Sequence, residues 1–405
     1  MQRRSVVWAV ILVVVAYVLG TAGIYWGLMS QRVVAVWDFY QLWYSARALL
    51  LEQRDPYDPQ VTLEIQRALY GRPAFPSEGR PAFYYPLPVL LLVAPFALLL
   101  YPSAAAAWLC LLLFAVVAAV GAILRGVKWH ASTLGAAMLV LWALALFPVL
   151  WSVLLGQVAV LLLVPLNVGL AALLHRRDRL AGVCLALSAL KPQLVCLPLP
   201  LLSVWALVNR RWCLLVAFIA TLVALGAASW LLLPAWPAHF VASVSTYATV
   251  SPFPAPLQVL LEKWLGLPVS WLWVAVGMLL LVGCLVSWLQ AREKPQHLAR
   301  AVGETLVVSA LLTPGIGMIN QLTLLWPALV VAARLRARPG WGRVITVALL
   351  VAMMVVPWTL AAMVTIPPGA QRYEVEHQAL APFLPVLLGS ALGAQWYFGR
   401  GNDDV

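Results

Sequence analysis

The stretch VVWAVILVVVAYVLGTA, residues 6–22, holds no charged side chain and does not alternate between apolar and polar positions. A second run, ITVALLVAMMVV at residues 345–356, has the same character. Such runs are typical of helices in lipid, because a membrane-spanning strand would alternate at every second residue. Inside a bilayer each backbone N–H and C=O needs an internal partner, which a helix supplies. We therefore expect an all-α, polytopic integral membrane protein.

The composition of the whole chain points the same way. Of the 405 residues 64% are hydrophobic and 10% are charged, whereas a soluble domain has about 45–50% apolar and about 25% charged residues. We assign the net charge of +12 to Lys and Arg in short cytoplasmic loops and not to nucleic-acid binding. The five cysteines show no paired spacing, so we expect neither disulfides nor a metal site.

The N-terminal segment is read as a retained first helix. Residues 1–4 are basic and residues 5–28 are apolar. This run is longer than the core of about 7–15 residues that a signal peptide carries. It ends in Tyr25 and Trp26, which suit a membrane interface. We expect the N-terminus, and by parity the C-terminus, in the cytoplasm.

The number of crossings depends on one short segment. Residues 86–100 are apolar but bounded by prolines, and they are few for a crossing of about 20 residues. If they do not cross, the later basic loops fall inside, as the positive-inside rule requires. We therefore predict a GT-C-like arrangement of about twelve crossings over 5–28, 103–124, 131–151, 157–174, 180–190, 193–208, 213–235, 269–290, 301–313, 320–333, 343–366 and 378–397.

Two outer loops result from this topology. The first, residues 29–102, is large and carries six of the 14 acidic residues between 29 and 85. Within it we expect short amphipathic helices over 39–53 and 61–70, with Asp58-Pro59 as a helix start. The second outer loop is predicted over 236–268. We find no internal repeat and treat residues 1–405 as a single transmembrane domain.

Asp38 is the first candidate for chemistry. It lies about ten residues beyond the first helix, between Trp37 and Phe39. Aromatic neighbours partly desolvate a carboxylate, which raises its pKa and makes it a stronger base. The alternative is a plain N-cap for the helix expected over 39–53. Trp37 and Trp43 also have the ring faces on which a sugar stacks.

Lys191 is the second candidate. It lies between two apolar runs, where a lysine is costly unless it faces a cavity or an anion. We predict that it binds a lipid phosphate; the alternative is snorkelling to the outer headgroups. Gln157 opens an apolar helix at the same outer face and is expected to cap that helix or bond a sugar hydroxyl.

A broken helix is predicted over 313–321. The sequence TPGIG at 313–317 precedes Asn320 and Gln321, and irregular backbone at membrane depth survives where it lines protein or a wet cavity. The alternative is an ordinary turn with polar caps. His239 and His377 are expected to be loop residues. Because the chain has no nucleotide-binding fingerprint, we expect any sugar donor to be a membrane lipid.

An ordered set of short motifs resembles glycosyltransferase family 87, which contains GT-C-fold enzymes similar to polyprenyl-phosphate-mannose-dependent mannosyltransferases. The resemblance covers roughly residues 30–330 and rests on WDFYQLW (37–43), DPYDP (55–59), FYYPLP (83–88), LGQV (155–158), RLAG (179–182) and LKPQ (190–193).

The resemblance implies a mechanism. Asp38 would be the general base that deprotonates the acceptor hydroxyl, which attacks the sugar carbon bearing the polyprenyl phosphate and inverts its configuration. Lys191 and Gln157 would hold the lipid phosphate. No metal or other cofactor is implied, since the lipid-phosphate sugar is a substrate. The residues expected to line the cavity are Tyr40, Trp43, Arg47, Asp58, Tyr85, Asn320 and Gln321.

The resemblance also leaves alternatives open. Many relatives carry a histidine where this chain has Asn320 and Gln321, so a sugar other than mannose is open. The acceptor is a glycolipid, a glycan or a protein, reached from the outer face of the plasma membrane. The competing functions are a lipid or small-molecule transporter or flippase, and a non-catalytic assembly factor. The lack of a repeat and the clustering of acids in one outer loop favour the enzyme.

Overall fold

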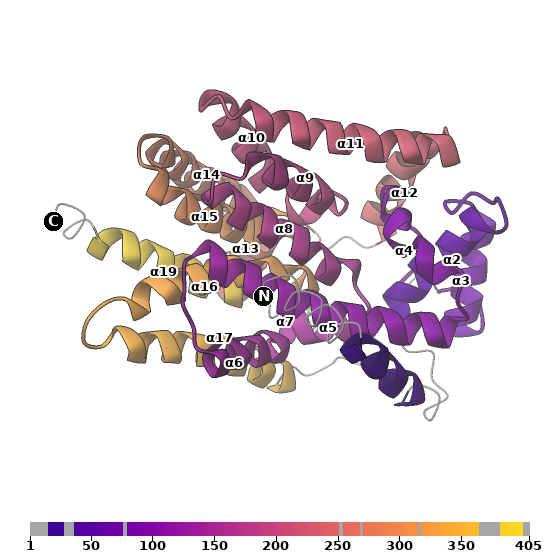
Figure 1. Cartoon of the computed structure of the whole chain (residues 1–405), viewed down its shortest axis with the longest axis horizontal. Helices are drawn as coiled ribbons and strands as arrows, with labels where there is room; N and C mark the ends of the chain where they lie inside the picture. Colours follow the sequence, from indigo (N-terminus) through magenta and orange to yellow (C-terminus); the bar gives the residue numbers. More distant parts are fainter. Residues whose placement is uncertain are drawn as a thin grey trace, which may run out of the picture. The chain divides into compact units, whose positions relative to one another are not determined.

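The computed structural model describes residues 15–27, 36–75, 79–250, 254–267, 270–314, 317–363 and 381–399. All regular structure in these residues is helical (Figure 1). The chain forms two compact units: a first unit of residues 1–117, 151–161 and 225–251, and a second unit of residues 118–150, 162–224 and 252–405. Each unit is described by itself, and the single domain over 1–405 stays a prediction.

The first unit contains most of the predicted first outer loop. Its helices are a helix over 15–27, α2 (Trp37–Leu50), α3 (Pro59–Tyr70), α4 (Val89–Ala97), the first part of α5 (Tyr101–Gly126) and α12 (Trp236–Val250). The two short helices expected over 39–53 and 61–70 are confirmed as α2 and α3. The start of the predicted first crossing lies outside the described residues.

Asp58 begins α3 as the sequence predicts. Its carboxylate accepts a hydrogen bond of 2.6 Å from the backbone N–H of Gln60, and Pro59 occupies the first helical position. Proline suits that position because its missing N–H would have no partner there anyway. The helix ends at Gly71, whose φ of 72° lies in the left-handed region that glycine tolerates.

Side chains of α2 complete the end of α4. The indole N–H of Trp43 donates to the carbonyl groups of Phe96 and Leu99, both at 3.2 Å, and Arg47 donates to that of Ala97 at 2.8 Å. The carbonyls of Phe96 and Ala97 belong to the last turn, where a helix has no internal donor for them, and Leu99 follows the helix end. The nine residues of α4 extend about 14 Å, about half the thickness of a hydrocarbon core of about 30 Å. This length agrees with the prediction that 86–100 does not cross as a helix.

The second unit is built around α15. Residues 298–312 form α15, and most of its side chains are buried. It packs against α10, α14, α16 and α19. The main helices of this unit are α6 (Thr133–Ala145), α9 (Asp178–Ser188), α10 (Pro198–Val208), α14 (Ser270–Glu293), α16 (Leu325–Arg336), α17 (Gly342–Met363) and α19 (Phe383–Gly399). Helices α5, α7 (Phe147–Leu155), α8 (Val158–Leu174) and α11 (Trp212–Leu232) contribute residues to both units.

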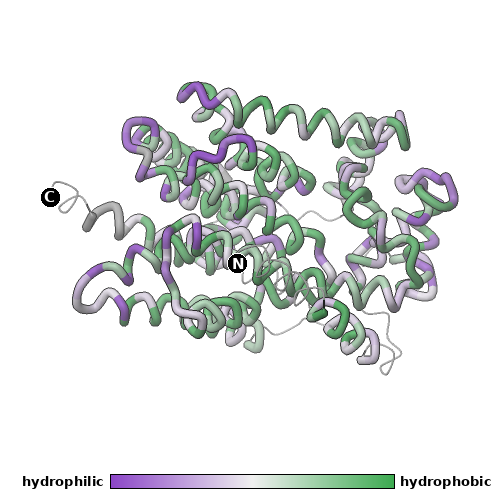
Figure 2. The backbone as a smooth tube through the Cα atoms, in the orientation of Figure 1, coloured by the Kyte–Doolittle hydropathy of each residue, from purple (hydrophilic) through white to green (hydrophobic). Residues whose placement is uncertain are grey.

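Five helices of the described residues are long and apolar enough to cross a membrane. They are α5, α11, residues 271–293 of α14, the segment Met318–Arg336 and α17, and the bent pair α6–α7 would add a sixth. Figure 2 shows hydrophobic colours along these helices and hydrophilic colours at their connections, as in the turn between α14 and α15. The protein is therefore an all-helical chain with membrane-spanning candidates. The predicted total of twelve crossings is not confirmed.

Three predicted crossings, 131–151, 193–208 and 320–333, are not continuous α-helices; the third begins in a 3₁₀ helix, Met318–Leu324. Residues 131–151 divide into α6 and α7, bent by 68° at Leu146. Pro148 explains the break, because it lacks the N–H that would bond the carbonyl four residues earlier. The segment 193–208 begins instead with a short 3₁₀ turn, Pro192–Leu194, and α10 starts only at Pro198.

Candidate active site

Asp38 lies in the first turn of α2, half-buried. The residue that caps this helix is Val36, with φ of 70° and no side-chain cap. The alternative of Asp38 as the N-cap is therefore wrong. A carboxylate in the first turn is favoured by the partial positive charge at the helix N-terminus.

Amide groups hold both oxygens of Asp38. Gln157 Nε2 donates to Oδ2 at 2.5 Å, and Gln41 Nε2 donates to Oδ1 at 3.3 Å. Gln41 lies on the same helix, whereas Gln157 comes from the segment that joins α7 to α8. Hydrogen bonds to the charged form stabilise a carboxylate as an anion. The sequence predicts Gln157 as a phosphate ligand. In the structure its amide nitrogen contacts Asp38.

Gly156 brings Gln157 to this position. Its φ is 75°, and a Cβ added there would run into Val36 and lie 2.8 Å from the Cβ of Phe39. The indole N–H of Trp108 donates to the carbonyl of Gly156 at 2.9 Å, and its ring stacks on Phe39 with centroids 4.7 Å apart. Only glycine allows the backbone this close to the start of α2.

Two tyrosines lie within electrostatic reach of Asp38. Burial raises the pKa of Tyr85, and the charge of Asp38 adds to the effect. Burial likewise raises the pKa of Tyr247 to about 12, again with a contribution from Asp38. Both phenols are therefore protonated at neutral pH. Tyr85 was expected in the cavity, whereas Tyr247 was missed because it lies in α12, in the second predicted outer loop.

His239 ties α12 to the first loop. Its Nδ1 lies 2.6 Å from Asp55 Oδ2, close enough for a hydrogen bond or an ion pair. Ser243 on the same helix donates to the carbonyl of Phe83 at 3.4 Å. The sequence predicts His239 as a loop residue, but it lies within a helix and pairs with an acid far away in the chain.

Other predicted lining residues have structural contacts. Trp43 and Arg47 bond the end of α4, and Asp58 caps α3. Tyr40 stacks on Tyr44 with ring centroids 6.0 Å apart and meets Tyr101 edge to face at 4.8 Å. These contacts connect the side chains to the scaffold that carries Asp38.

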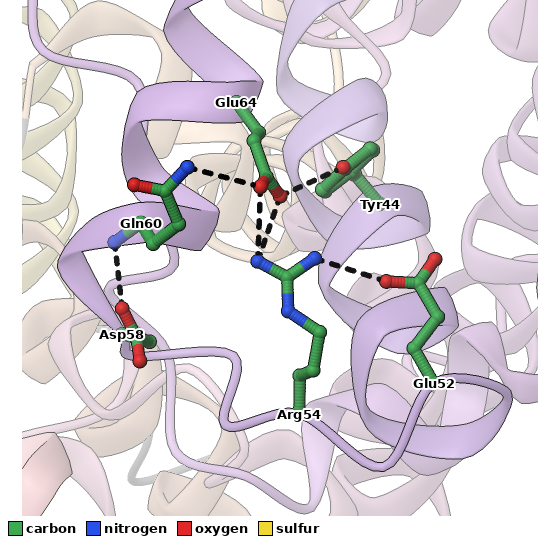
Figure 3. A network of polar contacts seen from close by, with 6 residues as sticks. All are labelled: Tyr44, Glu52, Arg54, Asp58, Gln60 and Glu64. Atoms are coloured by element: carbon green, nitrogen blue, oxygen red, sulfur yellow. Dashed lines mark hydrogen bonds and ion pairs between the residues drawn. The ribbon is translucent and has the colours of Figure 1, made fainter.

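A polar network joins α2 and α3 (Figure 3). Glu64 accepts hydrogen bonds from Tyr44 at 2.9 Å, Arg54 at 3.0 Å and Gln60 at 3.3 Å. Arg54 also bonds Glu52 at 3.1 Å. Burial alone would raise the pKa of Glu64, but these hydrogen bonds and the Arg54 charge outweigh it and lower the pKa. Glu52 and Glu64 thus help to hold α2 and α3 together.

Lys191 lies in the second unit. Its side chain is buried, with 3% exposed, and its Nζ donates to Asn320 Oδ1 at 2.8 Å. Burial inside the unit argues against the snorkelling alternative. Asp38 and Lys191 belong to different units.

The predicted broken helix is confirmed around Asn320. Helix α15 ends at Leu312, a 3₁₀ helix spans Met318–Leu324, and α16 begins at Leu325. Gln321 Nε2 donates to the carbonyl of Ala381 at 2.5 Å. Its Oε1 is buried and has no hydrogen-bond partner among the described residues. Gly315 and His377 lie outside those residues. Among the described residues, no group of three or more His, Cys, Asp or Glu side chains is placed to hold a metal ion.

Comparison with known proteins gives one match. The model of glycosyltransferase family 87 matches residues 83–314, a little over half of the chain. The match includes Gln157 and Lys191 but begins after Asp38 and ends before Asn320. No curated protein and no solved structure matches the chain.

Proposed function

Since the chain belongs to glycosyltransferase family 87 and is a membrane glycosyltransferase, we propose that it moves a hexose from a polyprenyl phosphate to an acceptor hydroxyl. Mannose is the first candidate for the sugar. The reaction takes place at the outer face of the plasma membrane, in a GT-C-like fold with about twelve crossings. Family membership supports this enzyme over the transporter or flippase.

Asp38 is the general base of the proposed reaction. The acceptor oxygen loses its proton to the Asp38 carboxylate and forms a bond to the anomeric carbon of the sugar. The bond from that carbon to the phosphate oxygen breaks, and polyprenyl phosphate leaves with the electron pair. One displacement from the opposite side inverts the configuration at the sugar carbon.

The observation that carries this proposal is the way Asp38 is held. Gln157 and Gln41 orient its two oxygens, and the protonated phenols of Tyr85 and Tyr247 lie near it. A half-buried carboxylate in fixed orientation is what a general base needs, because proton transfer depends on geometry first and on pKa second.

Lys191 is proposed to bind the donor phosphate. Its ammonium is buried and held by the carbonyl oxygen of Asn320. A fixed cation near the leaving phosphate stabilises the charge that develops as the sugar bond breaks. The side-chain amide of Asn320 orients the ammonium.

The test is transfer of radiolabelled sugar in membranes. Wild type and Asp38→Asn are compared at equal protein level, with Glu52→Gln as a control that changes an exposed acid of the same loop. We expect Asp38→Asn to lose at least about 100-fold in rate, the usual contribution of a general base, and Glu52→Gln to retain its rate. Equal transfer by wild type and Asp38→Asn would remove Asp38 from the mechanism.

The donor is tested in the same membranes. Polyprenyl-phosphate mannose is offered first, then other polyprenyl-phosphate sugars, then nucleotide sugars to the purified protein in phospholipid membranes that contain no polyprenyl carrier. Transfer from a lipid-phosphate sugar supports the proposed donor class. Transfer from nucleotide sugars in carrier-free membranes contradicts it, and so does a lack of transfer from every lipid-phosphate sugar in the panel.

A further inference from the structure

We propose that Gln157 is a positioning residue: its amide nitrogen holds Asp38 and fixes the direction in which this carboxylate takes the acceptor proton. The inference rests on the proposed role of Asp38 as the base. It replaces donor-phosphate binding as the role of Gln157. The two roles predict different kinetic defects, so that one set of variants separates them.

The two amides that bond Asp38 differ in what they fix. Gln41 lies three residues further along α2, so it moves together with Asp38. Gln157 is 119 residues away in sequence and comes from the segment between α7 and α8. The Gln157 bond therefore sets the orientation of Asp38 against a second part of the first unit. It is also the shorter bond, at 2.5 Å against 3.3 Å.

The backbone around Gln157 is itself fixed. Its N–H donates to the carbonyl of Ser152 at 2.9 Å, and its own carbonyl accepts from Val160 at 3.1 Å. Gly156 before it is pressed against the start of α2, and Trp108 holds the carbonyl of Gly156. The side chain is 5% exposed. A donor fixed in this way is preorganised, so no ordering is needed at the moment of reaction.

The Gln157 bond has a measurable effect on proton transfer. An amide N–H stabilises the anionic carboxylate more than the protonated one. Without this donor, Asp38 holds its proton up to a higher pH, and the acidic limb of the pH–rate profile moves upward. Misalignment of the base by about 1 Å lowers the chemical rate by about 100-fold. A phosphate ligand would instead raise the donor KM when removed.

Three variants test the inference. Gln157→Met keeps the length of the side chain and removes the donor, and Gln157→Glu keeps the shape and places a second carboxylate against Asp38. The matched control is Gln66→Met, in the same unit and 6% exposed, whose amide oxygen accepts from the backbone N–H of Ala74.

Two readouts are used. The first is kcat and donor KM as functions of pH in membranes. The second is modification of Asp38 by a water-soluble carbodiimide, which reacts with protonated carboxyl groups, followed by mass spectrometry. This labelling gives the pH midpoint of Asp38 in the full-length protein without any turnover, so it does not depend on knowing the sugar.

The expected labelling midpoint of Asp38 rises from Gln66→Met to Gln157→Met to Gln157→Glu. Gln157→Met lowers kcat by about 100-fold with the donor KM nearly unchanged, and it raises the labelling midpoint of Asp38 by about one pH unit, as loss of one hydrogen bond to a charged group predicts. Gln157→Glu raises the midpoint further, because two adjacent carboxylates share a proton. Gln66→Met leaves the midpoint at its wild-type value.

The inference is overturned if Gln157→Met and Gln66→Met share the wild-type midpoint, or if Gln157→Met raises only the donor KM. In either case a strong defect of Asp38→Asn would leave the proposed function standing. If Asp38→Asn transfers sugar normally, the proposed base is wrong, and the inference fails with it whatever the midpoints are.

Discussion

The two units hold their candidate charges in the same way but with opposite signs. In the first unit, the carboxylate of Asp38 receives an amide N–H from Gln157. In the second unit, the ammonium of Lys191 donates to the amide oxygen of Asn320. A side-chain amide, which has a donor end and an acceptor end, thus bonds an anion in one unit and a cation in the other.

Charges elsewhere in the second unit are held differently. Asp178, in the first turn of α9, accepts from Arg211 Nε at 2.7 Å, and Glu304 on α15 accepts from Arg300 at 2.6 Å. These are ion pairs, in which the two charges compensate each other. An amide orients a charge through a hydrogen bond and brings no opposite charge of its own. The contrast separates residues suited to chemistry from residues suited to holding helices together.

The largest expected effect is at the cation. Lys191→Met removes the charge and keeps an apolar side chain of similar length, so we expect kcat/KM for the lipid-phosphate donor to fall by about 100-fold or more. Lys263→Met, at an exposed position in the second predicted outer loop, should keep wild-type kinetics. Wild-type kinetics in Lys191→Met would show that the second unit does not bind the donor phosphate through this residue.

The next largest effect is expected at Gly156, in the backbone that places Gln157 against Asp38. Gly156→Ala should destabilise the protein by about 1–3 kcal/mol from backbone strain alone and by more because the new Cβ runs into Val36. Gly71→Ala is the matched control, since its φ is also positive and nothing lies within 4 Å of the added Cβ. Thermal unfolding in detergent measures both. Equal losses would mean that the close approach at Gly156 contributes nothing.

A smaller effect is expected in the network of Figure 3. The pKa of Glu64 is lowered in the folded protein, so its stabilising contribution is present above its usual pKa of 4.5 and is lost as the pH falls below that value. Glu64→Gln should cost less than about 1 kcal/mol near pH 7, because solvent screens the exposed part of the pair. Its stability should also vary less than that of wild type below pH 5. An unchanged acid dependence of unfolding would contradict this account.

The smallest effect concerns the phenols. The pKa of Tyr44 and that of Tyr247 are each raised to about 12, chiefly by burial. The folded state therefore keeps both protonated above the usual value of 10.0, and the stability they contribute is full below pH 10 and is lost as the pH rises toward 12. Absorbance of tyrosinate should show both titrating late, and Tyr247→Phe should remove one late step. Loss of an early step in Tyr247→Phe would contradict the burial of this ring.

Much of the helical structure is predictable from sequence. The apolar runs at 103–124 and 157–174 agree with α5 and α8 to within a few residues, because a long apolar run in lipid has few alternatives to a helix. The start of α3 is predictable because Asp58-Pro59 is a local signal. The break at Leu146 was missed, although Pro148 provides its cause.

The site is less predictable, because its contacts join distant parts of the chain. Asp38 and Lys191 stand out in the sequence as charges in apolar surroundings. Nothing local indicates that Gln157 bonds Asp38 or that Asn320 bonds Lys191 at a separation of 129 residues. Trp43 and Arg47 have side chains equally suited to a sugar and to open carbonyl groups, and only the position of α4 decides between the two.

The cap on α4 also has a consequence for biosynthesis. Trp43 and Arg47 leave the ribosome about 50 residues before the carbonyl groups that they bond. The partners of this helix end are therefore already present when residues 89–97 emerge. The last carbonyl groups of this short apolar segment therefore need not remain without hydrogen bonds in lipid. Vectorial synthesis, from α2 toward α4, supplies the cap before the helix that needs it.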